Sequence, residues 1–231
     1  MAGSERRMKL FGSWFLLGML ALTSNAYAHG HWIDLDRFNP EIGKAVNLFV
    51  RSGHYFPKSG QKLSEKVMQG VTARRPDGQT LAVEIAAGEK EWLGTFTPQE
   101  GGVYVIAFSL KRPRAPAPNY EGKAILVAGP GSDSADRYAL GSGLELIPEK
   151  SVSELKPGDE LPVWLTLDGV KVEGEVKIVP ANGKSTTART GAEKPAVVKL
   201  RDEGRYLLTA SVKGRGCSLV FHIAEAEEKS K

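Results

Sequence analysis

The sequence predicts an all-β protein, with two tandem immunoglobulin-like β-sandwich domains following a cleaved signal peptide. Three observations lead to this prediction. Short runs of four to eight residues, rich in β-branched and aromatic side chains, recur along the chain between Gly, Pro, Asp and Asn residues. The second half repeats the pattern of the first at an offset of about 100 to 115 residues, the length of one immunoglobulin-like sandwich. The first 28 residues have the composition of an export signal.

Residues 1–28 are expected to form a secretory signal peptide. Three basic residues precede an apolar run over 11–22, which is shorter than the roughly 20 residues that a membrane-spanning helix needs. Ala26 and Ala28 are the small residues that signal peptidase requires just before its cleavage site. We therefore expect an exported, periplasmic protein whose mature chain begins at His29.

Composition excludes several classes of protein. A chain of 231 residues with 41% hydrophobic residues, a net charge of +4 and one cysteine is neither disordered, nor a disulfide-stapled mini-protein, nor a polytopic membrane protein. Residues 1–28 hold three basic residues and one acidic residue, so the mature chain has a net charge of only +2. No basic stripe interleaved with aromatic residues is present, and we expect no nucleic-acid partner. Cys217 is interpreted as a small buried hydrophobic residue.

The two sandwiches are expected at 29–130 and 138–224, followed by a charged tail at 225–231. The clearest strand-like runs lie at 45–50, 103–108, 161–167, 176–179 and 206–210. The small, polar, turn-rich segment at 129–134 marks the seam between the halves. A Gly-x-Tyr sequence leads into a late strand of each half and predicts two tyrosine corners, at Tyr104 and Tyr206.

The chain has four histidines, at positions 29, 31, 54 and 222, and two of them stand at the predicted mature terminus. One possible metal site is square-planar: the free amine, the backbone amides of Gly30 and His31, and the His31 imidazole, which together favour Cu(II) or Ni(II). The other is a brace, in which the amine and side chain of His29 chelate the metal and a further histidine completes the set. His54, after a strand and a glycine, is the expected extra ligand for either site.

Other polar residues are weaker candidates. His222 is expected within the last strand as a packed or rim histidine. Asp34 and Asp36 alternate along the first strand and therefore share a face. They are expected to be solvated carboxylates; the alternative is that they bind the metal through oxygen or hydrogen-bond to its ligands.

Enzymatic motifs are missing from the sequence. It contains no Gly-x-Ser-x-Gly elbow, no phosphate-binding glycine loop and no His-Glu-x-x-His pair. We therefore expect a protein that is not an enzyme, with copper-dependent oxidative chemistry at an N-terminal histidine brace as the one enzymatic alternative. The competing class is a structural or adhesion-type module that binds protein or carbohydrate.

The motifs Gly30-His31-Trp32-Ile33 and 53–57 (Gly-His-Tyr-Phe-Pro), together with three segments at 143–148, 155–161 and 167–174, resemble the NikM-like or CbiK-like periplasmic proteins. These proteins are often described as nickel or cobalt uptake components. The resemblance covers nearly the whole mature chain and departs from the family at Lys171, where proline is common.

The resemblance implies an exported β-sandwich that binds a transition metal through amino-terminal nitrogens and histidines. Carried over by position, His29 and His31 match the amino-terminal histidine region and His54 matches the Gly-His loop. The implied metal is Ni(II) or Co(II), with Cu(II) as a further candidate, and the implied partner is a membrane metal-uptake permease. Because no membrane helix is expected after the signal, delivery, buffering or sensing of metal is favoured over direct translocation.

Overall fold

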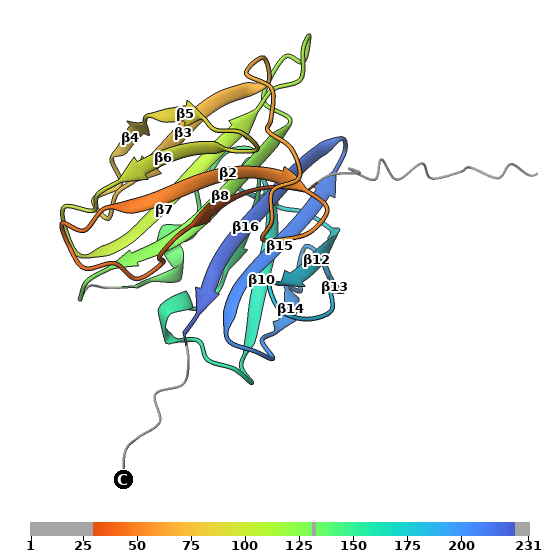
Figure 1. The fold of residues 1–231 in the computed structure, drawn as a ribbon. Coiled ribbons are helices and arrows are strands. Elements are labelled where there is room, and N and C mark those ends of the chain that lie inside the picture. Colours follow the sequence, from red (N-terminus) through yellow and green to blue (C-terminus); the bar gives the residue numbers. More distant parts are fainter. Residues whose placement is uncertain (1–29, 131–132, 225–231) are drawn as a thin grey trace, which may run out of the picture.

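The computed structural model describes residues 30–130 and 133–224, which form an all-β fold (Figure 1). Within these ranges the only helices are two short 3₁₀ turns, η1 (Ala135–Tyr138) and η2 (Val152–Glu154). The predicted fold class, a pair of immunoglobulin-like β-sandwiches, is confirmed. None of the helices in the described ranges has the length and apolar character to cross a membrane. The predicted signal peptide and charged tail lie outside the described residues.

The strands form three sheets. The first sheet contains, in spatial order, β1 (Gly30–Leu35), β2 (Val46–Gly53), β6 (Trp92–Phe96) and β5 (Ile85–Ala87). The central sheet contains β13 (Thr186–Thr190), β12 (Gly174–Pro180), β15 (Gly204–Val212), β16 (Arg215–Ile223), β8 (Tyr120–Ala128), β7 (Gly102–Leu110), β3 (Met68–Arg74) and β4 (Thr80–Val83). The third sheet contains β11 (Val170–Lys171), β10 (Glu160–Leu167) and β14 (Ala196–Lys199), with β9 (Leu144–Pro148) also paired to β10.

The two halves of the chain share the central sheet. Strand β8, from the first half, pairs in parallel with β16, the last described strand, from Tyr120–Gly216 to Ala124–Val220. Figure 1 shows the orange-to-green strands of the first half beside the teal-to-blue strands of the second. The two sandwiches are therefore joined edge to edge by backbone pairing.

The first and third sheets cover opposite faces of the central sheet. Even-numbered residues of β7, such as Tyr104 and Ile106, pack in a core with the first sheet. Odd-numbered residues, such as Val103 and Val105, pack in a second core with the third sheet. Since alternate residues of a strand point to opposite faces, β7 must be apolar on both faces and carries a nearly continuous hydrophobic run.

Both predicted tyrosine corners are present. The Tyr104 hydroxyl donates to the Glu100 carbonyl at 3.0 Å and accepts from the Glu100 amide at 3.1 Å. The Tyr206 hydroxyl donates to the Asp202 carbonyl at 2.8 Å and accepts from the amides of Asp202 and Arg201 at 3.1 Å. In each half a buried phenol thereby satisfies backbone groups of the turn before its strand.

The connection between the halves carries a core residue. Tyr138, at the end of η1, is fully buried in the core beneath the third sheet, and its hydroxyl accepts from the Val152 amide at 2.8 Å. The same hydroxyl donates to Asp133. The segment after 133 is therefore packed against the second half, and the boundaries predicted at 130 and 138 stay a prediction.

Candidate functional site

His31 lies near the start of β1, an outer strand of the first sheet. Its Nδ1 is 3.0 Å from the hydroxyl oxygen of Ser52, the residue opposite it on β2. The ring meets the Tyr120 ring edge-on, with the centroids 4.9 Å apart. The Tyr120 hydroxyl also donates to the His31 carbonyl at 2.7 Å. The imidazole is thus held in one orientation by groups from two sheets.

The strand register explains why His31 and Ser52 meet. Just beyond β1, the Asp36 amide donates to the Asn47 carbonyl at 3.0 Å, in the same register as the β1–β2 ladder. Antiparallel pairs alternate between hydrogen-bonded and non-hydrogen-bonded types. Asp36 and Asn47 are at a hydrogen-bonded position, and the type alternates from there toward Gly30. Gly30 and Gly53 are therefore a hydrogen-bonded pair. His31 and Ser52 are a non-hydrogen-bonded pair, in which side chains approach most closely.

His54 directly follows β2 on an exposed loop. Its ring centroid is 6.4 Å from that of Tyr55, which is 80% exposed. The loop folds back on the strand, because the Gly60 amide donates to the Ser52 carbonyl at 2.8 Å. A Cβ on Gly53 would lie 2.9 Å from the Gly60 nitrogen, so this close return requires glycine at position 53.

Two of the three predicted metal ligands lie at the same end of the β1–β2 pair. Gly30 pairs with Gly53; His31 is the chain neighbour of the former and His54 of the latter. The third predicted ligand, His29, lies outside the described residues. Within 30–130 and 133–224, no three His, Cys, Asp or Glu residues are grouped so that they could hold a metal ion. No motif pointed to Ser52 and Tyr120, the two side chains that orient His31.

His222 belongs to a different part of the fold. Its ring stacks on Phe38, with centroids 5.7 Å apart and an interplanar angle of 17°. Burial, with a further contribution from Arg205, lowers the pKa of His222. Tyr120, which contacts His31, pairs in register with Gly216. The six steps along the strand from Gly216 to His222 cover roughly 20 Å, so the two histidines are far apart.

Cys217 is a buried core residue on β16. Burial raises the pKa of its thiol, and the neutral form is therefore favoured. This agrees with its interpretation as a small hydrophobic residue.

The expectation that Asp34 is solvated is wrong. Its side chain is completely buried, and one carboxylate oxygen accepts from Arg51 Nη1 at 2.6 Å and from Arg205 Nη1 at 2.7 Å. Burial raises the pKa of Asp34, and the two arginines act in the opposite direction. Asp36 is exposed and accepts from the amide and side chain of Asn47. Asp34 differs because Arg205, distant in sequence, reaches it from the second half.

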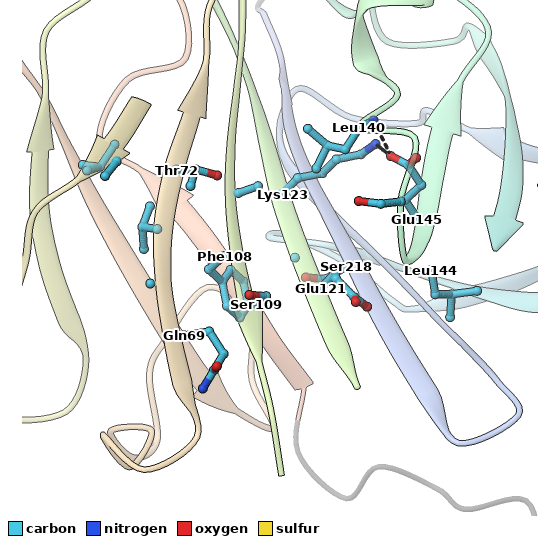
Figure 2. Close-up of a pocket in the computed structure, with 17 residues that line it drawn as sticks. Gln69, Thr72, Phe108, Ser109, Glu121, Lys123, Leu140, Leu144, Glu145 and Ser218 are labelled. Atoms are coloured by element: carbon cyan, nitrogen blue, oxygen red, sulfur yellow. Dashed lines mark hydrogen bonds and ion pairs between the residues drawn. The ribbon is translucent and has the colours of Figure 1, made fainter. Parts of the chain in front are cut away.

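A cleft of about 360 Å³ opens on the central sheet, apart from the histidines (Figure 2). Its floor comes from β3, β7 and β8, and its far wall from residues 140–145. Figure 2 shows Gln69, Thr72 and Ser109 on the sheet side, with Leu140 and Leu144 across from them. The sequence offered no motif that pointed to this cleft.

Several solved structures are similar to this chain at low sequence identity. The D0–D1 domain of intimin is 14% identical, with a TM-score of 0.27 over 83% of this chain and 95% of that one. A two-domain fibronectin type III segment of chicken tenascin is 16% identical, with a TM-score of 0.27 over 85% and 100%. A DUF4785 family protein from Legionella pneumophila is 10% identical, with a TM-score of 0.32 over 83% and 54%.

None of the curated proteins compared with the chain matches it. The family described as "Domain of unknown function (DUF4198)" matches residues 26–214. This match begins just before the predicted mature terminus and ends within the last β-hairpin, so it covers most of both halves. The chain belongs to the DUF4198 family.

Proposed function

We propose that this β-sandwich protein is exported to the periplasm and binds a transition metal, Ni(II) or Co(II) with Cu(II) as a further candidate, through His29, His31 and His54. Its partner would be a membrane metal-uptake permease, to which it delivers the ion. The resemblance of its histidine motifs to the NikM-like and CbiK-like proteins supports this proposal.

The observation that carries the proposal is the pairing of Gly30 with Gly53. His29 precedes Gly30 by one peptide bond, and His54 follows Gly53 by one. Cα atoms of paired antiparallel residues are roughly 5 Å apart, and one peptide bond adds about 3.8 Å on each side. Two histidines and the amine of a chain starting at His29 are thereby tethered to one rung of the sheet.

The fold favours the brace over the square-planar site. A square-planar set uses Nδ1 of His31, since that nitrogen closes a six-membered ring with the residue's own amide. It also uses the backbone amide of Gly30. In the fold, Nδ1 is bonded to Ser52, and the register assigns the Gly30 amide to the strand ladder. A brace built on His29 leaves both interactions in place, and the Ser52 hydroxyl then orients the His31 ring through its hydrogen bond.

Isothermal titration calorimetry tests the proposal. Protein exported with its own signal is purified, its terminus is established by intact mass, and it is titrated with Ni(II), Co(II) and Cu(II). The same titrations are made on His31→Ala, His54→Ala and a control, His222→Gln, which removes an imidazole distant from His31. We expect one metal per chain, weakened binding in the first two variants, and unchanged binding in the control.

Two results would overturn the proposal: no binding by the wild type, or equal binding by the wild type and His31→Ala. A mature chain that starts elsewhere than at His29 would remove the amino-terminal geometry. Hydrogen peroxide production with copper and ascorbate, clearly above that of free copper, would favour the oxidative enzyme over a metal carrier.

A second candidate function is a recognition module that binds protein or carbohydrate. The cleft of Figure 2 favours it, because no histidine lines the cleft among the described residues and its polar groups belong to a different surface from His31. Retention of a ligand in this cleft by a metal-free protein would separate this function from the first.

A further inference from the structure

The floor of the cleft consists of two rungs that cross the central sheet. In the first rung Ala82, Thr72, Ala107 and Lys123 lie side by side on β4, β3, β7 and β8. In the second rung Gly70, Ser109 and Glu121 lie side by side on β3, β7 and β8. Apart from Lys123 and Glu121, these side chains are small, so the floor is low and partly polar.

Further along β7 and β8, the same face of the sheet carries large apolar side chains instead of small ones. There Val103, Val105, Ile125 and Val127 are large, apolar and packed under the second half. The change from these residues to Ala107 and Ser109 occurs within two positions of β7. Large side chains at positions 107 and 109 would fill the cleft. Because Ala107 and Ser109 are small, about 360 Å³ stays open.

A buried ion pair fixes the wall opposite the floor. Lys123 Nζ is 2.6 Å from Glu145 Oε2 and donates to the Tyr138 carbonyl at 2.7 Å. The Glu145 carboxylate accepts from the amides of Leu140 and Gly141 at 2.9 and 2.8 Å. Figure 2 shows Lys123 reaching Glu145 beside Leu140. The wall is thus anchored to β8 before any ligand arrives.

Arg74 makes a second anchor from β3. Its guanidinium donates to the carbonyls of Arg137 and Ala139, just before the wall. Both sides of the cleft are therefore tied together by polar groups of the sheet. A preformed cleft of this kind pays little ordering cost on binding.

The charged side chains that line the cleft are paired. Lys123 is paired with Glu145, and Glu121 is paired with Arg215 at 2.9 Å. Burial also raises the pKa of Glu121, against the lowering effect of Arg215. With no uncompensated charge on its lining, the cleft offers nothing to stabilise a phosphate, a carboxylate or a cation.

We infer that the cleft binds a neutral, polyhydroxylated ligand of about disaccharide size. Hydroxyls of Thr72, Ser109 and Ser142 and the amide of Gln69 both donate and accept, as sugar hydroxyls require. The remaining lining includes Leu140 and Ala82, which supply apolar surface for the C–H face of such a ligand. This inference deepens the second candidate function and is independent of the metal site.

Saturation-transfer NMR on the full chain tests the inference. The neutral probes are maltose, cellobiose and trehalose, and the charged comparator is glucuronate. In Ala107→Leu the new side chain fills the cleft, and Thr72→Val removes one hydroxyl without changing its shape. Ala86→Leu, on the exposed part of β5, is the matched control. Thermal unfolding of each variant establishes that it is folded.

We expect transfer to at least one neutral disaccharide and not to glucuronate. The signal should disappear in folded Ala107→Leu, weaken in Thr72→Val by roughly tenfold in affinity, and persist in Ala86→Leu. No transfer from any neutral probe, transfer that survives in Ala107→Leu, or preference for glucuronate would each overturn the inference. If Ala107→Leu does not fold, Thr72→Val decides. None of these variants changes a histidine, so the outcome of this experiment is independent of the outcome of the metal titrations.

Discussion

His31 and Ser52 face each other across the β1–β2 pair, with the imidazole Nδ1 3.0 Å from the serine hydroxyl. A hydroxyl in this position holds the ring in one orientation. If the imidazole binds metal, removing this orienting group should weaken binding, although it ligates nothing itself.

Ser52→Ala is therefore expected to lower metal affinity by roughly tenfold to a hundredfold, the usual effect of losing a hydrogen bond that orients a metal ligand. Titration calorimetry measures the change. The matched control is Ser59→Ala, on the loop that follows β2, whose hydroxyl donates to the Lys90 carbonyl at 2.7 Å. Equal affinities for Ser52→Ala and wild type would show that Ser52 has no part in binding.

Asp34 links the two halves of the molecule, because Arg51 comes from β2 and Arg205 from β15. We expect Asp34→Asn to lower the free energy of unfolding by about 3 kcal/mol, at the low end for breaking a buried ion pair. The low end applies for two reasons. Arg205 is partly exposed, and in the variant Arg51 still has an ion-pair partner in Glu91, at 2.5 Å.

Urea denaturation measures this loss. The control is Asp36→Asn, an exposed residue just after β1. This variant should lower the free energy of unfolding by less than about 1 kcal/mol. If the two variants were equally stable, the buried link would contribute nothing specific.

The Lys123–Glu145 pair is almost completely buried on both sides. Burial lowers the pKa of Lys123, while Glu145 opposes that effect. Lys123→Met should cost about 3–5 kcal/mol, because it leaves Glu145 buried without its cation. The double variant Lys123→Met/Glu145→Gln should recover part of this loss. Chemical denaturation of the wild type, Lys123→Met and the double variant measures their free energies of unfolding. Equal stability of Lys123→Met and the wild type would contradict this prediction.

His222 should make stability depend on pH. Its pKa in the fold is lowered from 6.5 by burial, so the unfolded chain binds the proton more tightly. The stabilisation is fully present above about pH 6.5 and is lost as the pH falls through the lowered folded pKa. His222→Gln should flatten the dependence of the unfolding free energy between pH 7 and pH 5. An unchanged slope in this variant would mean that His222 is not responsible.

Much of the fold could be predicted from local patterns. The tyrosine corners at Tyr104 and Tyr206 were predictable because glycine, turn and tyrosine lie within five residues of one another. The strands themselves follow from runs of β-branched and aromatic residues between turn formers. These signals act over short distances, and the sequence displays them directly.

The long-range features could not be predicted. Asp34 has an ordinary strand position, and only the folding of Arg205 against it, 171 residues away, makes it a buried carboxylate. The parallel pairing of β8 with β16 leaves no periodicity in the sequence. The cleft likewise depends on small residues from β3 and β7 meeting the wall at 140–145, and no single segment carries that pattern.

The candidate metal site was predictable in part. Its histidines are visible in the sequence, and His31 and His54 do lie at the same end of paired strands. The roles of Ser52 and Tyr120 depend on cross-strand register and on packing between sheets, which spacing alone does not specify.

The most direct test of the metal site is the affinity for Ni(II) and Cu(II) of two proteins that differ by one residue. One starts at His29, and the other starts at Ala28 and therefore has a displaced amine. If the amine and the imidazole of His29 bind the metal together, the added alanine should weaken binding roughly tenfold or more, equivalent to about 1.4 kcal/mol. Equal affinities would contradict a site built on the mature terminus.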